Sequence, residues 1–246
     1  MRNLLLISKE DFKNLIKNPM WIFYGTLFPI LFVSILGFLG KESYGNNVTS
    51  YDYYGITLMI YSILSSGMTS ANAFMEEKIR KPNMRIVYAP GSVKSIYISK
   101  IISSFVFSCL CHLFDMIVLC IMYHIHITVT FEIMILFVLI EFFSVALGVM
   151  FCCIFKTEAM ANQLLGMIIN LFAVFGGLLF PMDGYGKIVR GISYLSPAKW
   201  VMKTTFSMIY DNNFSMFYIT ALVLIFATVI VFVVSEKTFK KEDCIC

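Results

Sequence analysis

Six stretches of about twenty mostly apolar residues constrain the fold of this chain more than any other feature. They occupy the windows 20–40, 53–75, 98–123, 131–155, 159–181 and 216–235. A helix advances by about 1.5 Å per residue, so about 20 apolar residues are enough to cross the hydrocarbon core of a bilayer. The sequence therefore predicts an all-α polytopic membrane protein with six transmembrane helices.

The composition points the same way. Of the 246 residues, 59% are hydrophobic and 14% are charged, whereas soluble domains average roughly 45–50% apolar and about 25% charged residues. We expect residues 1–246 to form a single membrane domain. The net charge of +4 is small, and no basic stripe is interleaved with exposed aromatic residues, so we expect no nucleic-acid partner.

Lysine and arginine are distributed unevenly between the connections. Fourteen of the 19 fall in segments that would share one side of the membrane, and five fall on the other side. The positive-inside rule then predicts that both termini are cytoplasmic. The longest inner connection is 76–97 and the longest outer connection is 182–215, and long connections in compact domains tend to be functional.

Residues 1–18 predict an amphipathic interface helix on the membrane surface. Leu5, Phe12 and Ile16 form one apolar stripe at helical spacing, with basic residues beside it. Pro19 ends this helix, because the residue before a proline avoids the helical region. The alternative interpretation is an ordinary basic flank that only sets the topology.

The outer connection 182–215 predicts a re-entrant hairpin before the last helix. Gly177 and Pro181 interrupt an apolar helix, and Pro197 and Trp200 follow in a short half-apolar segment. Non-helical backbone at membrane depth is tolerated only inside protein or beside a water-filled cavity. The lysine and arginine residues of this segment would reach the headgroups by snorkelling; they are Lys187, Arg190, Lys199 and Lys203.

The inner connection 76–97 predicts a cytoplasmic coupling segment. It opens with Glu76 and Glu77 and then places Tyr88 in an apolar stretch before Pro90. An exposed apolar edge among charges favours a docking surface for another protein. The alternative interpretation is a solvated charged loop.

Three ionisable residues fall inside the predicted spans. His112 and Asp115 are three residues apart and share a helix face, and Glu141 lies near the middle of the fourth window. An intramembrane ionisable group is costly and is a functional hypothesis by default. The three side chains are candidates to line a translocation pathway or relay protons, and the alternative is an interhelical polar lock.

The order of four motifs resembles the permease subunit of ABC transporters of the type 2 exporter family. The motifs are the basic start before Asn18-Pro19, Glu76-Glu77 followed by Tyr88-Ala89-Pro90-Gly91-Ser92 and Lys100, Gly176-Gly177 with Phe180-Pro181, and Ile192 to Pro197 followed by a tryptophan. The resemblance covers essentially the whole chain. One departure is Lys81 to Arg85, where the family usually has a Gly-Thr-Leu-Glu-like run.

This resemblance implies an efflux permease in a bacterial cell membrane that forms half of a translocation pathway. It implies an ABC ATPase dimer that binds ATP and Mg²⁺, docked on Glu76, Glu77, Tyr88 and Pro90, and a second permease copy or a sister permease. The chain has no G-x-x-x-x-G-K-[ST] phosphate loop, so we expect no catalytic residue, cofactor or metal of its own. By resemblance, the cargo is a hydrophobic or amphipathic compound such as a drug or antimicrobial.

Two other functions remain open. The first is a secondary transporter or channel that uses His112, Asp115 and Glu141. The second is a membrane-bound enzyme or scaffold, although the chain has no HExxH, paired CxxC or G-x-S-x-G motif.

Overall fold

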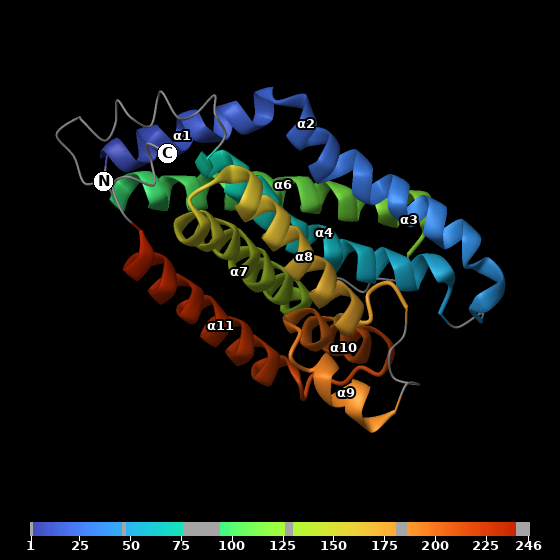
Figure 1. The fold of residues 1–246 in the computed structure, drawn as a ribbon. Coiled ribbons are helices and arrows are strands. Elements are labelled where there is room, and N and C mark those ends of the chain that lie inside the picture. The colour runs from blue at the N-terminus through green and yellow to red at the C-terminus, as the bar shows by residue number, and fades with distance from the viewer. Residues whose placement is uncertain (1, 46–47, 76–93, 126–129, 181–185, 240–246) are drawn as a thin grey trace.

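The computed structural model describes residues 2–45, 48–75, 94–125, 130–180 and 186–239, and every regular element in these residues is a helix (Figure 1). The helices are α1 (Arg2–Lys17), α2 (Pro19–Ile22), η1 (Phe23–Leu27), α3 (Phe28–Leu39), η2 (Lys41–Ser43), α4 (Ser50–Met75), α6 (Lys94–Tyr123), α7 (Phe131–Phe155), α8 (Glu158–Gly176), α9 (Lys187–Ser193), α10 (Pro197–Tyr210) and α11 (Phe217–Thr238). The predicted all-α class is confirmed.

Five helical stretches of the described residues are long and apolar enough to cross a membrane. They are Pro19–Leu39, Tyr97–Tyr123, Phe131–Phe155, Glu158–Gly176 and Phe217–Thr238. The predicted window 53–75 lies within α4, which has 26 residues but mixes serine, threonine, tyrosine and asparagine with its apolar residues. The structure thus supports five spans by length and composition, and the crossing of α4 stays a prediction.

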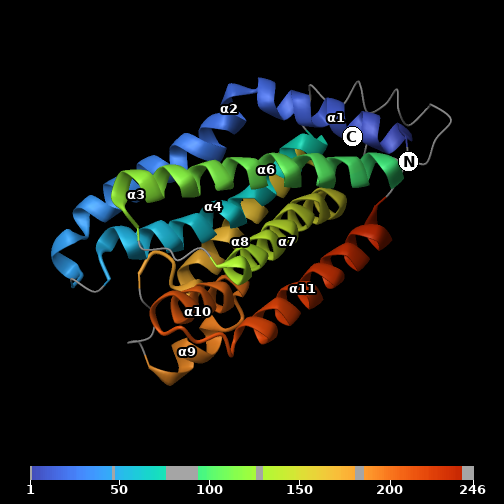
Figure 2. The same cartoon turned by 180° about the vertical axis from the view of Figure 1, so that it is seen from behind.

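The long helices alternate in direction along the bundle. At one end Phe239, just after α11, packs on Phe74 of α4 and Tyr97 of α6, with ring centroids 6.3 and 5.6 Å apart. At the other end Tyr51 of α4 stacks on Tyr123 of α6 at 4.4 Å. The start of α1 and the end of α11 lie at the first of these ends in both views (Figures 1 and 2).

Helix α4 runs through the centre of the bundle and packs most closely against α7. A Cβ atom added to Gly148 of α7 would lie 2.0 Å from the carbonyl oxygen of Gly67 on α4. The hydroxyl of Ser144 donates to the carbonyl of Leu64, and the hydroxyl of Ser70 donates to that of Val145 at 2.7 Å. Small residues allow this approach, and hydroxyl groups bridge the two backbones, as is common in membrane helix pairs.

Helix α1 lies against α6 and buries an ion pair there. Lys100 and Asp11 form a salt bridge, and the side chains of both residues are less than a tenth exposed. The hydroxyl of Ser99 also donates to Asp11, at 3.3 Å. Burial raises the pKa of Asp11, and the ammonium of Lys100 opposes that rise. The apolar residues Leu5 and Ile16 remain exposed on α1, and their contact with a membrane surface stays a prediction.

The first apolar stretch bends locally at a π-helical turn, Phe23–Leu27. Pro29 follows this turn and has no backbone N–H, so it cannot donate to the carbonyl four residues earlier. A Cβ added to Gly25 would lie 3.2 Å from Sγ of Cys111 on α6. The turn therefore brings the first stretch into contact with α6 near the middle of the bundle.

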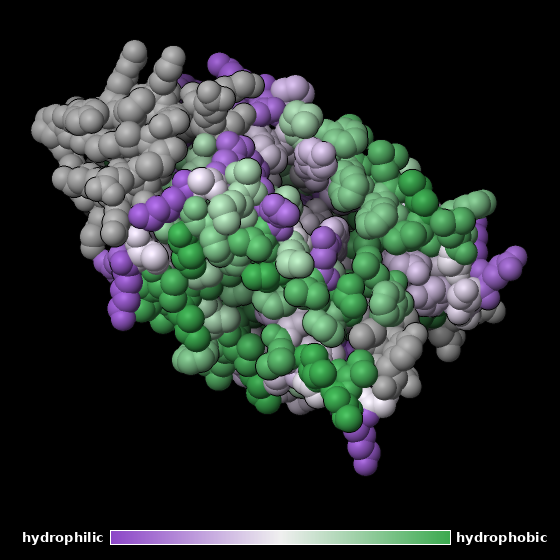
Figure 3. Space-filling model, viewed as in Figure 1, coloured by the Kyte–Doolittle hydropathy of each residue, from purple (hydrophilic) through white to green (hydrophobic). Residues whose placement is uncertain are grey.

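The surface of the bundle is largely apolar across its middle, and hydrophilic residues gather toward its ends (Figure 3). Large side chains that are more than two-fifths exposed run along α11; they are Tyr218, Ile219, Leu222, Ile225, Phe226, Val229, Ile230 and Val233. An apolar surface of this extent marks contact with lipid or another protein.

Candidate translocation site

The structure brings two of the three predicted intramembrane residues into direct contact. Nδ1 of His112 on α6 lies 2.6 Å from Oε2 of Glu141 on α7, and both residues are buried. The other ring nitrogen, Nε2, lies 3.0 Å from the hydroxyl of Ser62 on α4. His112 thus ties three helices together by hydrogen bonds through the middle of the bundle.

Asp115 lies one turn beyond His112 on α6 and is fully buried. Neither carboxylate oxygen of Asp115 has a hydrogen-bond partner in the described part of the chain, and the same holds for Oε1 of Glu141. A buried polar atom without a partner costs free energy, so these oxygens have unused capacity for a proton or a ligand.

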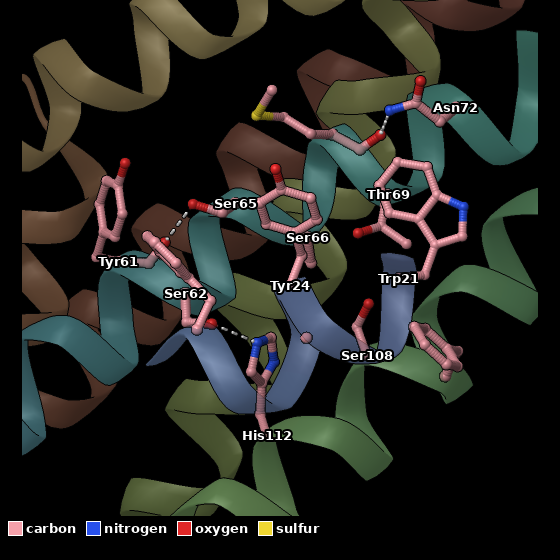
Figure 4. Close-up of a pocket in the computed structure, with 14 residues that line it drawn as sticks. Trp21, Tyr24, Tyr61, Ser62, Ser65, Ser66, Thr69, Asn72, Ser108 and His112 are labelled. Atoms are coloured by element: carbon pink, nitrogen blue, oxygen red, sulfur yellow. Dashed lines mark hydrogen bonds between the residues drawn. The ribbon is translucent and has the colours of Figure 1, made fainter. Parts of the chain in front are cut away.

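A cavity of about 340 Å³ lies on one side of His112, between the first apolar stretch, α4 and α6 (Figure 4). The aromatic residues Trp21, Tyr24 and Phe28 face it from the first stretch, and Phe107 faces it from α6. Helix α4 contributes mostly polar groups; those lining the cavity are Tyr61, Ser62, Ser65, Ser66, Thr69 and Asn72. The cavity is therefore amphipathic, with aromatic side chains opposite a row of hydroxyl and amide groups.

The same row of α4 continues toward α8. Asn72 and Asn162 exchange two side-chain hydrogen bonds, of 2.8 and 3.3 Å, and the hydroxyl of Tyr61 donates to Asn170 at 3.1 Å. These amides hold α8 beside the cavity, as polar residues do between membrane helices. Among the described residues, no three His, Cys, Asp or Glu side chains gather closely enough to hold a metal ion.

The described part of the predicted outer hairpin contains two short helices, α9 and α10, and begins at the end of α8. Gly177 ends α8 with a φ of 75°, a left-handed conformation that glycine adopts at little cost. Pro197 begins α10, and Nε1 of Trp200 donates to the carbonyl of Tyr194 at 2.8 Å. The position of Pro181 lies outside the described residues, and the depth of the hairpin in a bilayer stays a prediction.

The basic residues of the hairpin do not all behave as expected. Lys199 is only 2% exposed, so its side chain is covered by protein, and its place at the headgroups stays a prediction. Lys203 donates to the hydroxyl of Tyr194 at 2.7 Å, and this hydrogen bond holds the pKa of Tyr194 below its usual value.

The predicted coupling residues Glu76, Glu77, Tyr88 and Pro90 lie outside the described residues. The helix ends that flank them, Met75 and Lys94, belong to the same end of the bundle as the start of α1.

Comparison with known proteins decides the family. A family model described as ABC-2 type transporter matches residues 2–210, which is most of the chain. The chain belongs to the ABC-2 type transporter family. No curated protein matches it in a sequence comparison. The family and the five apolar helices together make this ABC-2 protein a multi-pass membrane permease.

Sequence reasoning missed two parts of the arrangement in this permease. Ser62 was not singled out, although it lies one helical turn before the small residues Ser65 and Ser66. The burial of Lys100 against Asp11 was also missed, since the sequence placed Lys100 among the cytoplasmic charges and in the motif that resembles the coupling segment. The sequence did carry a signal for this pair. Asp11 lies four residues after Ile7 and four residues before Leu15, so it shares a helix face with Leu15, which is buried.

Proposed function

We propose that this ABC-2 permease forms half of the translocation pathway of an exporter driven by a separate ATPase. The observation that carries the proposal is the amphipathic cavity beside α4, within a bundle of the ABC-2 family. Substrate sites in membrane transporters commonly lie between the spanning helices, where polar groups are rare unless they serve packing or transport.

The cavity also supports a class of cargo. Its aromatic wall offers apolar area, and its hydroxyl and amide groups offer hydrogen bonds to a polar head. We infer that the exported compound is hydrophobic or amphipathic, such as a drug or an antimicrobial compound.

One chain supplies only half of the pathway. Exposed apolar residues on α8 flank the polar row of α4; they are Met160, Met167 and Leu171. A second permease copy or a sister permease would cover this face and close the pathway. ATP and Mg²⁺ would be bound by the partner ATPase, not by this chain.

The proposed ATPase contact lies at the end of the bundle that carries the start of α1 and the end of α11. Because 14 of 19 basic residues belong to the segments predicted on this side, we assign it to the cytoplasm. The coupling segment 76–97 joins α4 to α6, so movement of the segment would act on both helices that line the cavity.

A second function is favoured by one observation. His112, Asp115 and Glu141 are buried together, and three of their carboxylate oxygens have no partner among the described residues. Such a cluster suits a secondary transporter or channel driven by an ion gradient.

The docking proposal is tested by Tyr88→Ala and Glu77→Arg in the full chain, purified from its own membranes. A central aromatic anchor is worth about 2 kcal/mol or more, so we expect co-purification of the ATPase to weaken by more than about tenfold. Tyr218→Ala and Glu42→Arg are the controls, because both residues are exposed and lie at the opposite end of the bundle. Wild-type recovery of ATPase with both test variants would place the docking surface elsewhere.

A further inference from the structure

A second cavity, of about 180 Å³, lies on the other side of His112. Side chains of α4, α6 and α7 line it, and all but two of them are apolar or sulfur-containing; the full set is Met59, Ile63, Cys109, Leu110, His112, Leu113, Met116, Met134, Phe137, Val138 and Glu141. We call this cavity the α6–α7 pocket. It is separate from the amphipathic cavity, and His112 lines both.

The α6–α7 pocket opens toward the lipid-facing side of the bundle. Leu110, Leu113 and Val138 line it and are 53%, 40% and 44% exposed. All three residues lie well inside helices that are apolar enough to span a membrane. A molecule dissolved in the hydrocarbon of the bilayer would therefore reach this pocket laterally, without passing through water.

Glu141 is the acidic residue among those that line this apolar pocket. The side chain is only 2% exposed, and its Oε2 is bonded to His112. Oε1 has no partner in the described residues. Leaving a buried carboxylate oxygen unsatisfied is costly, so the arrangement favours a ligand that brings positive charge or a hydrogen-bond donor.

The charges around the pocket point to a positive ligand. Two carboxyl groups belong to the cluster around a single imidazole: Glu141 is hydrogen-bonded to His112, and Asp115 is buried one turn further along α6. The second nitrogen of that imidazole is already bonded to Ser62, and α4 brings no charged group to the cluster from its described residues. No lysine or arginine lines either cavity. The α6–α7 pocket therefore offers a ligand the carboxyl group of Glu141 and, among the described residues that line it, no lysine or arginine.

We propose that the α6–α7 pocket binds a hydrophobic organic cation, which enters from the bilayer and places its charged centre against Glu141. The apolar walls bury the body of the cation, and the ring of Phe137 offers an additional contact for positive charge. The proposal adds a positive charge to the hydrophobic cargo. It rests on the proposed export function only for the transport step that follows binding.

The test uses the purified full chain in lipid nanodiscs, with empty nanodiscs as background. The probe is radiolabelled benzyltrimethylammonium, compared with phenylmethanesulfonate, an anion with a similar apolar body. We expect saturable binding of the cation and none of the anion.

Glu141→Gln keeps the shape of the side chain but removes its charge, so the affinity for the cation should fall by about tenfold or more. Glu132→Gln, nine residues earlier on α7, is the matched control and should bind as the wild type does.

A second variant keeps the test decisive in case Glu141→Gln does not fold. Val138→Trp narrows the mouth of the pocket at a partly exposed position and leaves the bond between His112 and Glu141 intact, so it should abolish binding by blocking entry. If Glu141→Gln does not fold, Val138→Trp decides alone. Equal binding of cation and anion, absence of saturable cation binding, or wild-type affinity in Val138→Trp would overturn the proposal. Binding requires no ATPase, so any of these results would leave ATP-driven export standing.

Discussion

At the scale of single residues, Gly67 and Gly148 set the distance between the central helix α4 and its neighbour α7. The added Cβ at position 148 would meet the backbone oxygen of Gly67 at 2.0 Å and the hydroxyl of Ser70 at 2.3 Å. Backbone cannot move aside as a flexible side chain can, so α4 and α7 would have to separate. The hydroxyl bonds from Ser144 and Ser70 depend on the same distance.

Gly148→Ala should therefore destabilise the folded protein by about 1–3 kcal/mol, the usual cost of overpacking. Alanine favours helix by about 1 kcal/mol over glycine, so intrinsic propensity alone predicts the opposite sign. Gly166→Ala provides the control, because its added Cβ has only Met68 nearby, at 3.8 Å. Thermal unfolding in detergent should show a lower midpoint for Gly148→Ala and an equal or higher one for Gly166→Ala. A higher midpoint for both would contradict the close contact.

The buried pair of Asp11 and Lys100 also acts at this scale. Burial raises the pKa of Asp11 above its unfolded value, so the folded state holds the proton of Asp11 more tightly than the unfolded state does. The stability that this proton contributes is present at low pH and is lost as pH rises through the raised pKa. Lys100 limits the loss, and without it Asp11 would be a buried charge with less compensation.

Lys100→Met should cost about 3–5 kcal/mol at pH 7, the range for breaking a buried ion pair on one side. The cost should shrink between pH 7 and pH 5, because a protonated Asp11 needs no cation. Adding Asp11→Asn to Lys100→Met should recover most of the stability. Thermal midpoints of the single and double variants at both pH values provide the measurement, and an equal deficit in the two variants would mean that the pair is not coupled.

At the scale of elements, α4 combines two properties that rarely occur together. It is the central helix of the bundle, and 21 of its 26 residues are buried. Yet it is the one predicted span that does not appear among the five helices of sufficient hydropathy in the described residues. The reason is its row of polar side chains, which lowers its mean hydropathy. These side chains face other helices or the cavity, so α4 needs less hydropathy than a helix surrounded by lipid.

If α4 crosses the membrane, single cysteines in a cysteine-free background should label in a fixed pattern. An impermeant thiol reagent outside intact cells should reach Lys41→Cys and Asn213→Cys, and should not reach Thr157→Cys or Lys237→Cys; all four positions are exposed. If α4 stayed on one side of the membrane, every later helix would cross the membrane in the opposite direction. Labelling at positions 157 and 237 with protection at 213 would therefore show five spans, not six.

At the scale of the whole molecule, hydropathy predicted most of the long helices. The window 131–155 coincides with α7, and the window 98–123 falls inside α6, because lipid contact demands a continuous apolar run. Contacts between distant segments could not be predicted in this way. Asp11 and Lys100 are 89 residues apart, and only the packing of α1 on α6 brings them together.

The candidate site was likewise predictable from the sequence only in part. The sequence identified His112 and Glu141, because ionisable residues are rare inside apolar windows. It could not pair them, since the contact between α6 and α7 depends on how both helices pack around α4, where small residues such as Gly148 allow a close approach. The amphipathic cavity borders the π-helical turn, and the α6–α7 pocket lies between three packed helices; neither arrangement leaves a periodic signal in the sequence.

The most direct test of the account is the energy source of transport. The permease and its co-purified ATPase would be reconstituted in proteoliposomes held at zero membrane potential, and the uptake of labelled hydrophobic and amphipathic compounds would be measured. We predict uptake that requires ATP and Mg²⁺, stops with a non-hydrolysable ATP analogue and continues after a protonophore is added. Uptake that proceeds without ATP and collapses with the protonophore would contradict ATP-driven export and favour a secondary transporter built on His112, Asp115 and Glu141.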